Sequence, residues 1–203
     1  SFPTRRSSDL LDVCQEEQVQ ELLDKTEKTG KRAGYRQCDI SKEEKVKQVF
    51  EEIAGTYGRV DILVNNAGVV ADWNTSYQVN ALGTYYCSEA ARPYLEKTKG
   101  NIVILTSASV FSGGTGIPQY VTTKAGSYAL TRFLAREYAR LGIRVNGIAP
   151  AVVMSKMLAT RFGSEEAARE HYKSVMPLGR MGEPEDIASV ALFLASDMAS
   201  YLC

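Results

Sequence analysis

Short apolar runs alternate with longer amphipathic stretches along almost the whole chain. Runs rich in β-branched residues at 60–64, 101–105 and 143–148 are typical of strands buried on both faces of a parallel sheet. Shorter apolar segments at 11–13 and 34–38 are also expected to be strands. Apolar residues recur at helical spacing in between, over 16–29, 41–57, 72–96, 118–141, two segments within 155–175, and 184–196. This alternation predicts an α/β fold, a doubly wound parallel sheet built from βαβ units.

Local signals mark several helix ends. Ser41 with Glu44 three residues later predicts a capping box at the start of the second helix. Gly30 is expected to stop the first helix, whereas Pro118 and Pro184 suit the first turns of two later helices.

Composition limits the function classes. The 203 residues are 44% apolar, enough for one globular domain with a sizeable core. The formal net charge is zero and no basic cluster is present, which argues against nucleic acid as a partner. No apolar run reaches the length of a membrane span, and the four cysteines are widely spaced, so we expect a cytoplasmic protein without a metal site. For the single histidine, His171, a surface role is expected.

The first ten residues, SFPTRRSSDL, match the translation of a common sequencing adapter. We therefore exclude residues 1–10 from the fold and expect a single domain over residues 11–203, with the natural sequence beginning near Leu11. A genuine polar N-terminal tail is the alternative interpretation.

The residues that could act in catalysis lie in the stretch from Ser107 to Lys124. Ser107 follows the predicted strand 101–105, at the strand end where α/β sheets place their active sites. A glycine-rich loop leads to the next helix, on which Tyr120 and Lys124 are four residues apart and share a face. A lysine ammonium near a phenol lowers the phenol's pKa from about 10 and allows acid–base catalysis near neutral pH. The pattern predicts proton transfer at an alcohol or a carbonyl, with the serine hydroxyl holding the substrate oxygen in line.

Several motifs in order resemble the short-chain dehydrogenase/reductase family, whose members have a Rossmann fold. They are Asn65-Asn66-Ala67-Gly68, then Asn80, then the set of Ser107, Tyr120 and Lys124, then Arg144-Val145-Asn146 with Pro150, and finally the segment from Pro177 to Ala188. The resemblance extends from Leu11 to Cys203.

The resemblance implies a reaction and gives residues their roles. Hydride would pass between a nicotinamide ring and the carbon of a small secondary alcohol or ketone. Tyr120 would exchange the proton of the substrate oxygen, and Lys124 would lower the pKa of Tyr120 and bind the nicotinamide ribose. Ser107 would orient the substrate oxygen, and Asn80 would anchor a water that links Lys124 to solvent.

The resemblance also implies cofactor contacts. Asp12, at the end of a strand, would bind ribose hydroxyls and repel a 2′-phosphate, which favours NAD over NADP. Asp39 and Ile40 would contact the adenine ring, with a helix N-cap role for Asp39 as the alternative. The remaining expected contacts are Asn65, Asn66, Ala67 and Gly68 of the turn, Tyr120 and Lys124, and Pro150, Val153 and Ser155 near the nicotinamide.

The chain also departs from the family pattern. No glycine precedes Gly30, so the glycine-rich phosphate loop is missing, together with the first strand. The connection from Gly68 to Trp73 is shorter than usual, and the chain stops before the family's last strand. We therefore expect an incomplete Rossmann-like sheet, without its first and last strands, in a chain that is inactive through truncation. The strand 34–38 would either stand apart across a gap or pair with 60–64.

Two alternative functions remain open. A 3-oxoacyl carrier-protein reductase shares the chemistry, and the end of the chain resembles it equally well. A non-catalytic dinucleotide-sensing protein on the same fold usually lacks the tyrosine or the lysine, and both are here.

We also expect copies of the chain to form an oligomer. In similar proteins the helices that match 72–96 and 118–141 pair across a twofold axis, which implies a homodimer or homotetramer. The apolar residues expected on this surface are Tyr85, Tyr86, Leu130, Phe133 and Leu134.

Overall fold

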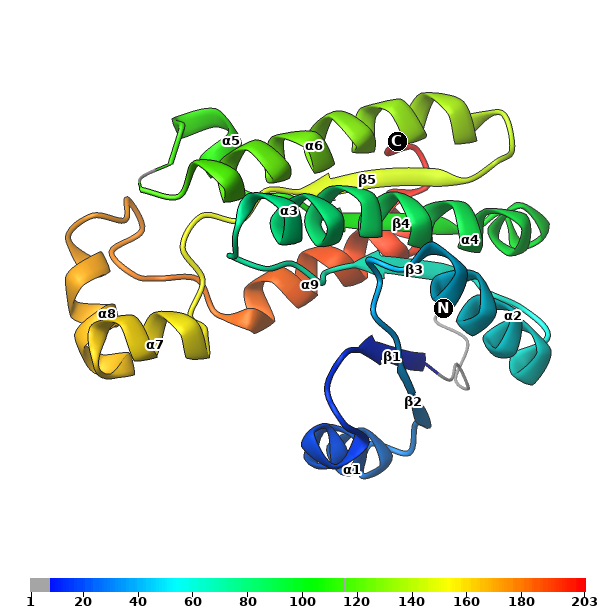
Figure 1. Ribbon diagram of the computed structural model, residues 1–203, viewed down its shortest axis with the longest axis horizontal. Coiled ribbons are helices and arrows are strands. Elements are labelled where there is room, and N and C mark those ends of the chain that lie inside the picture. The colour runs from blue at the N-terminus through cyan, green and yellow to red at the C-terminus, as the bar shows by residue number, and fades with distance from the viewer. Residues whose placement is uncertain (1–7, 115) are drawn as a thin grey trace.

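The computed structural model describes residues 8–114 and 116–203, without the side chains of residues 156 and 157. Strands and helices alternate along the chain, which confirms the predicted α/β class (Figure 1). The strands are β1 (Ser8–Asp12), β2 (Ala33–Gln37), β3 (Ile62–Asn65), β4 (Asn101–Leu105) and β5 (Arg144–Ile148). The α-helices are α1 (Gln20–Glu27), α2 (Glu43–Tyr57), α3 (Trp73–Ser76), α4 (Thr84–Thr98), α5 (Ser109–Ser112), α6 (Pro118–Ala139), α7 (Lys156–Phe162), α8 (Glu165–Lys173) and α9 (Pro184–Ala195). Shorter segments are the 3₁₀ turns η1 (Glu16–Gln18) and η3 (Asp197–Ala199) and the π-helical segment η2 (Tyr77–Gly83).

The main sheet is parallel and has the strand order β3-β4-β5. On β4, the central strand, Val103 is the register partner of Val64 on one side and of Asn146 on the other. All five β4 residues are buried, as a continuous apolar run on a doubly covered strand predicts.

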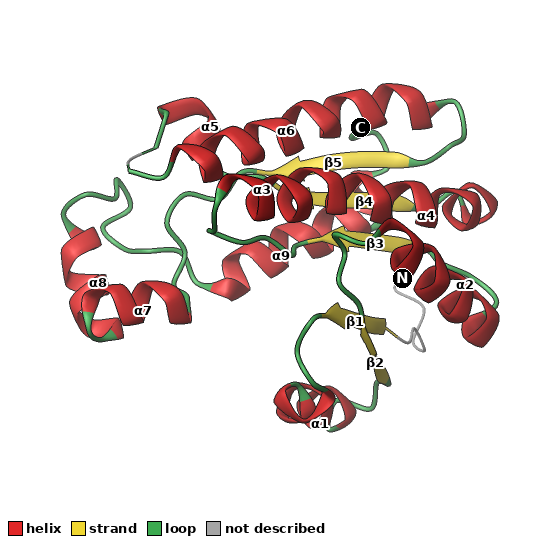
Figure 2. Cartoon of the chain, in the orientation of Figure 1, coloured by secondary structure: helices red, strands yellow, loops and turns green. Residues whose placement is uncertain are grey.

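Side chains of β4 alternate between two faces, and each face has its own hydrophobic core. Ile104 belongs to the cluster that contains Leu95 of α4 and Leu134 of α6. Val103 belongs to a second cluster with Leu194 of α9. Figure 2 accordingly shows α4 in front of the three strands and α9 behind them. The sheet is therefore covered on both sides, as the doubly wound fold requires.

The strands β1 and β2 form a separate two-stranded parallel sheet, in which Asp12 is the register partner of Gln37. Within residues 8–114 and 116–203, no strand pairing joins this sheet to β3. Figure 1 shows β1, β2 and α1 set apart from the main sheet. Of the two arrangements expected for the strand at 34–38, the structure has the one with a gap. One edge of β3 thus has no strand beside it, and Val64 of β3 is 44% exposed.

The strand β1 begins earlier than predicted, because it includes Ser8, Asp9 and Leu10. These residues pair with β2 because pairing uses backbone N–H and C=O groups, which almost any residue supplies. Asp9 also lies 3.6 Å from the guanidinium of Arg36. Excluding residues 8–10 from the fold is therefore wrong, whereas residues 1–7 lie outside the described residues.

The observed helix starts can be compared with the starts predicted from proline and capping residues. Pro118 and Pro184 begin α6 and α9, which confirms two predicted starts. The capping box predicted at Ser41 is wrong: α2 begins at Glu43, and the Ser41 amide instead donates to Asp39 Oδ1 at 2.9 Å. The turn that Asp39 closes moves the N-cap by one residue, from Ser41 to Lys42. The first predicted helix is divided into η1 and α1.

The predicted helix 72–96 is one continuous rod made of α3, η2 and α4. Asp72 caps its start, since its carboxylate accepts hydrogen bonds from the amides of Asn74 and Thr75. The rod contains a π-helical turn that periodicity could not predict. Such turns are rare and are often found at functional sites.

Of the helices that the described residues form, none is both long enough and apolar enough to cross a membrane. In the same part of the chain, no group of three or more His, Cys, Asp and Glu residues could hold a metal ion.

Candidate active site

The site residues surround the carboxyl end of β4. This strand ends at Leu105, and Ser107 follows two residues later. The Lys124 Nζ of α6 donates a hydrogen bond of 2.7 Å to the Leu105 carbonyl oxygen. This bond ties the face of α6 that carries Tyr120 and Lys124 to the strand end that leads into Ser107.

Lys124 is buried and close to Tyr120. Its side chain is 5% exposed, and burial lowers the pKa of its ammonium to about 8. Nζ lies 6.0 Å from the centroid of the Tyr120 ring. Because a group with this pKa is mostly protonated at pH 7, the phenol has a positive charge beside it. Within the described part of the chain, the Tyr120 hydroxyl makes no hydrogen bond, which leaves its proton available for a ligand.

Asn80 lies in the π-helical segment and is fully buried. Its Nδ2 donates to the Val69 carbonyl oxygen at 2.9 Å and to Thr123 Oγ1 at 3.0 Å. Its Oδ1 accepts from the Val69 amide at 2.8 Å. The side chain therefore fastens the turn after β3 to α6. Both Nδ2 protons are used by protein, so an anchored water has only Oδ1 left on this side chain.

Gly68 lets that turn approach the lysine. A Cβ at this position would lie 3.1 Å from Lys124 Nζ and 3.3 Å from Asn80 Oδ1. The absence of a side chain keeps the space beside the lysine open, and Gly68 itself is exposed. Lys124, Asn80 and Gly68 thus meet at one place, although they are far apart in the sequence.

The hydroxyl of Ser107 is held by the start of α5. Its oxygen accepts hydrogen bonds from the Ser109 amide at 3.2 Å and the Ser109 hydroxyl at 2.9 Å. The Ser107 oxygen therefore already accepts two hydrogen bonds, and its own proton is free to donate to another group. The neighbouring Ala108 amide donates to the Pro150 carbonyl oxygen at 2.8 Å, which joins the loops after β4 and β5.

Two predicted cofactor contacts have their side chains packed inside the protein. Asn65 is buried and its Nδ2 donates to Ser88 Oγ on α4 at 3.1 Å. Ile40 belongs to the main core and lies against Gly83, where an added Cβ would be 2.8 Å from Ile40 Cδ1. At Ile40 only backbone atoms remain for a ligand, whereas at Asn65 the Nδ2 group is already bonded within the protein. Asn66 and Ala67, next to Gly68, are exposed.

The other predicted contacts lie at strand and helix ends. Asp12 is exposed at the end of β1, where its Oδ1 accepts from the Cys14 amide at 3.2 Å. Val153 forms an isolated bridge with Gly182. The Ser155 hydroxyl caps α7 by accepting from the Leu158 amide at 3.3 Å, which leaves its proton free to donate.

Sequence reasoning missed the hydroxyl side chains that surround Asn80. Thr123 and Ser127 on α6 and Thr84 on α4 all bond to it. The sequence contains a pattern that could have indicated them, because polar residues recur every four positions where an amphipathic helix normally has apolar ones.

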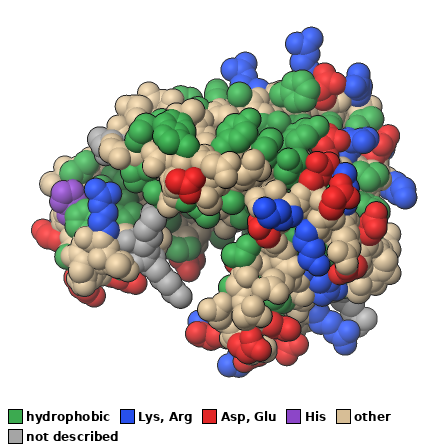
Figure 3. Space-filling model, in the orientation of Figure 1, with side chains coloured by type: hydrophobic (Ala, Val, Ile, Leu, Met, Phe, Trp, Pro, Cys, Tyr) green, Lys and Arg blue, Asp and Glu red, His purple; other side chains and the backbone are tan. Residues whose placement is uncertain are grey.

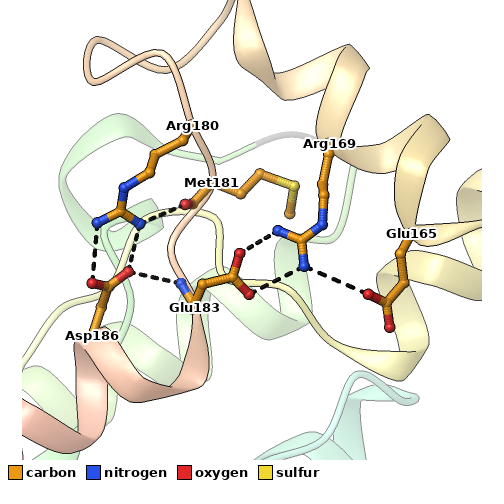
Figure 4. A network of polar contacts seen from close by, with 6 residues as sticks. All are labelled: Glu165, Arg169, Arg180, Met181, Glu183 and Asp186. Carbon is orange, nitrogen blue, oxygen red and sulfur yellow. Dashed lines mark hydrogen bonds and ion pairs between the residues drawn. The ribbon is translucent and has the colours of Figure 1, made fainter.

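A network of ion pairs fastens α8 to the start of α9 (Figure 4). The Arg169 guanidinium contacts the carboxylates of Glu183 and Glu165. The Arg180 guanidinium binds both oxygens of Asp186 at 2.6 and 3.1 Å and lowers the pKa of that carboxyl to about 2. These pairs fix the orientation of the α7–α8 pair relative to the last helix.

The residues present fit the nicotinamide end of a dinucleotide cofactor better than its pyrophosphate. Lys124 supplies a cation, and the missing side chain at Gly68 leaves space beside it. The Ser155 hydroxyl supplies a hydrogen-bond donor. Among the described residues, no glycine-rich turn leads directly from a strand into the N-terminus of the next helix, which is the usual pyrophosphate site.

Known proteins resemble this chain in sequence and in structure. The family described as "Enoyl-(Acyl carrier protein) reductase" matches residues 9–203. A 3-oxoacyl-[acyl-carrier-protein] reductase of Aquifex aeolicus is 36% identical over 186 residues, which cover 86% of this chain and 74% of that protein. A 3beta-hydroxysteroid dehydrogenase of Eggerthella lenta is 37% identical over 199 residues, which cover 92% of this chain and 76% of that protein.

A solved structure agrees with the fold. An NAD⁺-bound xylitol dehydrogenase superposes with a TM-score of 0.88 at 24% identity, covering 97% of this chain and 85% of that one. The family match spans nearly all of the sequence, and the relatives named above share more than a third of their aligned residues with it. The chain therefore belongs to the short-chain dehydrogenase/reductase family.

Proposed function

We propose that the protein is an NAD(P)-dependent oxidoreductase that interconverts a secondary alcohol and a ketone, with Tyr120 as the acid/base group. The observation that supports this most strongly is the placement of Lys124. Its buried ammonium is bonded to the end of β4 and lies 6.0 Å from the Tyr120 ring, on the same helix face. Family membership supplies the reaction class.

The residues divide the proton chemistry among them. When bound, the nicotinamide supplies or accepts the hydride. During reduction, Tyr120 donates its hydroxyl proton to the substrate oxygen, and Ser107 donates a hydrogen bond to the same oxygen. The positive charge of Lys124 stabilises the phenolate that this step leaves on Tyr120. Oxidation of an alcohol uses the same groups in reverse.

We propose NAD rather than NADP as the preferred cofactor. The support is Asp12, whose exposed carboxylate ends β1. A carboxylate at that position binds the ribose hydroxyls and repels a 2′-phosphate. The proposed cofactor site is completed by Asp39, Ile40, the Asn65–Gly68 turn, Pro150, Val153 and Ser155, with Ile40 contributing backbone only.

The substrate proposed is a small alcohol or ketone. A carrier-protein-linked 3-oxoacyl thioester is the second candidate, favoured by the likeness to the Aquifex enzyme. A basic patch near the site entrance would favour this second candidate. Arg140, a candidate for such a cation, lies at the opposite end of α6 from Tyr120 and is paired with Glu137 at 2.9 Å, so it does not serve this role.

We also propose a homodimer or homotetramer in the cytoplasm. Phe133 of α6 is 59% exposed, and Tyr85 of α4 and Phe111 of α5 are exposed as well. Figure 3 shows hydrophobic side chains gathered over this side of the molecule. The inclusion of Leu134 in this surface was wrong, because Leu134 points into the core between α6 and the sheet. A reducing compartment suits the four cysteines, all of which are free thiols.

The test is a spectrophotometric screen of the purified protein. Oxidation of NADH and of NADPH is followed with a diketone, a ketosteroid and a 3-oxoacyl thioester. The proposal predicts turnover of at least one ketone, faster with NADH. Turnover of the thioester alone would favour the carrier-protein reductase. Cofactor binding without turnover of any ketone or alcohol would contradict the enzyme and favour a dinucleotide sensor.

A further inference from the structure

Polar side chains are buried along α6 and along the helical rod that contains Asn80, and the two helices meet at the π turn. On each helix they recur every four residues, and none is more than 7% exposed. Buried polar groups are tolerated in such a contact only when they are hydrogen-bonded. The two rows are Thr123, Ser127 and Thr131 on α6, and Asn80, Thr84 and Ser88 on the rod.

Ser127 makes the bond that joins the two helices at the backbone. Its hydroxyl donates to the Asn80 carbonyl oxygen at 2.7 Å, with a longer alternative of 3.2 Å to Thr123 O. Thr84 Oγ1 donates to the same Asn80 oxygen at 2.9 Å from within the rod. Both lone pairs of this carbonyl are thus occupied by hydroxyl groups. The next residue of the α6 row, Thr131, bonds only within its own helix, to Ser127 O at 2.8 Å.

We propose that Ser127 is a positioning residue for the proton-transfer site: its hydroxyl locks the π turn of Asn80 onto α6 and so holds the Gly68 turn in place over Lys124. The inference rests on the proposed function for its catalytic meaning. Ser127 touches neither the substrate nor the reacting groups, and it acts through Asn80.

Each step of this coupling is a contact in the structure. Ser127 holds the Asn80 backbone, and the Asn80 side chain makes two hydrogen bonds to Val69. Val69 follows Gly68, whose missing Cβ would otherwise lie 3.1 Å from Lys124 Nζ. A shift of the π turn therefore changes how closely the Gly68 turn covers the lysine.

Loss of the Ser127 hydroxyl has a definite consequence for the lysine. It would leave one lone pair of the buried Asn80 carbonyl oxygen without a hydrogen-bond donor, which is unfavourable. Either a water molecule enters to replace the hydroxyl, or the turn rearranges locally. Either response admits solvent beside Lys124. Burial is what lowers the pKa of this ammonium, so hydration raises it toward the ordinary value of 10.5. The same change alters the charge that the Tyr120 phenol experiences.

The experiment compares Ser127→Ala with Thr131→Val in the ligand-free protein. Both variants remove one buried hydroxyl from α6, but only Ser127 bonds across to Asn80. The acylation rate of Lys124 is measured against pH by mass spectrometry, and amide hydrogen exchange is measured over residues 77–83. In Ser127→Ala we expect the midpoint of acylation to rise by about half a pH unit or more and exchange to quicken by roughly tenfold. Thr131→Val should leave both as in the parent.

A second variant and a second assay complete the test. Ser127→Thr retains the hydroxyl and should restore the acylation midpoint, which also covers the case in which Ser127→Ala folds poorly. In the assay of alcohol oxidation, Ser127→Ala should shift the pH profile of kcat, whereas Thr131→Val should leave the profile as in the parent. Equal acylation midpoints and exchange rates in Ser127→Ala and Thr131→Val would overturn the proposal. Absence of turnover in the parent protein would contradict the proposed function alone, because acylation and exchange do not depend on turnover.

Discussion

The buried lysine of the site makes the stability of the protein depend on pH in a direction that can be stated in advance. Lys124 has a pKa of about 8 in the folded chain, against 10.5 for an ordinary lysine, because it is buried. Between these two values the unfolded chain binds more protons than the folded chain, so the free energy of unfolding rises with pH. Below about pH 8 both states are protonated, and above about pH 10.5 both are neutral, so the contribution is constant there.

The size of the rise follows from the difference between the two pKa values. Each unit corresponds to about 1.4 kcal/mol, so the free energy of unfolding should increase by about 3 kcal/mol from pH 8 to 10.5 through this group alone. Lys124→Met removes the titration and should abolish the rise. The variant also leaves the Leu105 carbonyl oxygen without its partner, which costs about 1–3 kcal/mol. It should therefore be less stable than the parent above about pH 10.5, whereas below about pH 8 this loss is offset because the buried charge is removed as well.

The assay is urea unfolding across this pH range in the parent, in Lys124→Met and in Lys99→Met. Lys99 is a matched control because its Nζ also donates to a backbone carbonyl, Leu141 O at 3.0 Å, but from an exposed side chain. Other groups that titrate in this range affect all three proteins alike, so the difference between curves isolates Lys124. Parallel curves for the parent and Lys124→Met would refute the reasoning, because they would mean that Lys124 titrates as an exposed lysine.

Three further predictions follow from other contacts. Gly68→Ala places a methyl group 3.1 Å from a lysine that is already held by Leu105, so kcat should fall by roughly tenfold. Gly55→Ala, where an added Cβ meets no atom within 4 Å, is the control, and equal activity of the two variants would contradict this view of the turn. Amides of β2 should exchange at least about 100-fold faster than those of β4, because a two-stranded sheet is marginally stable alone; equal protection would show that both sheets unfold together. Arg169→Gln should speed proteolysis within α8 more than Lys173→Gln does, because only Arg169 reaches Glu183 beyond its own helix; equal rates would mean that the network in Figure 4 does not restrain this helix.

Much of the fold could be predicted because it depends on local pattern. The apolar run at 101–105 matches β4 residue by residue, and Pro118 and Pro184 begin the helices that they were expected to begin. These features depend on burial of a short run and on the backbone geometry of proline. Ser41 failed as a cap because the competing turn closed by Asp39 has comparable local signals.

The parts that could not be predicted depend on contacts distant in the sequence. The strand at 34–38 had two possible partners, and only tertiary structure decides between them. Residues 8–10 joined β1 because strand pairing depends on the backbone and places few demands on side chains. The motifs indicated Asn80 and Lys124, but the hydroxyl of Ser127 between their helices became visible only once α6 lay against the π turn.

The central claim is that Tyr120 transfers the proton at the substrate oxygen. The most direct test is single-turnover reduction of a ketone by Tyr120→Phe, with Tyr128→Phe as the control. Tyr128 lies two turns further along α6, and its ring packs edge-on against Phe111 at 5.3 Å. The account predicts that Tyr120→Phe slows the chemical step by roughly 10²–10⁴-fold with little change in cofactor affinity, while Tyr128→Phe stays near the parent rate. A Tyr120→Phe protein that reduces the ketone as fast as Tyr128→Phe would contradict it.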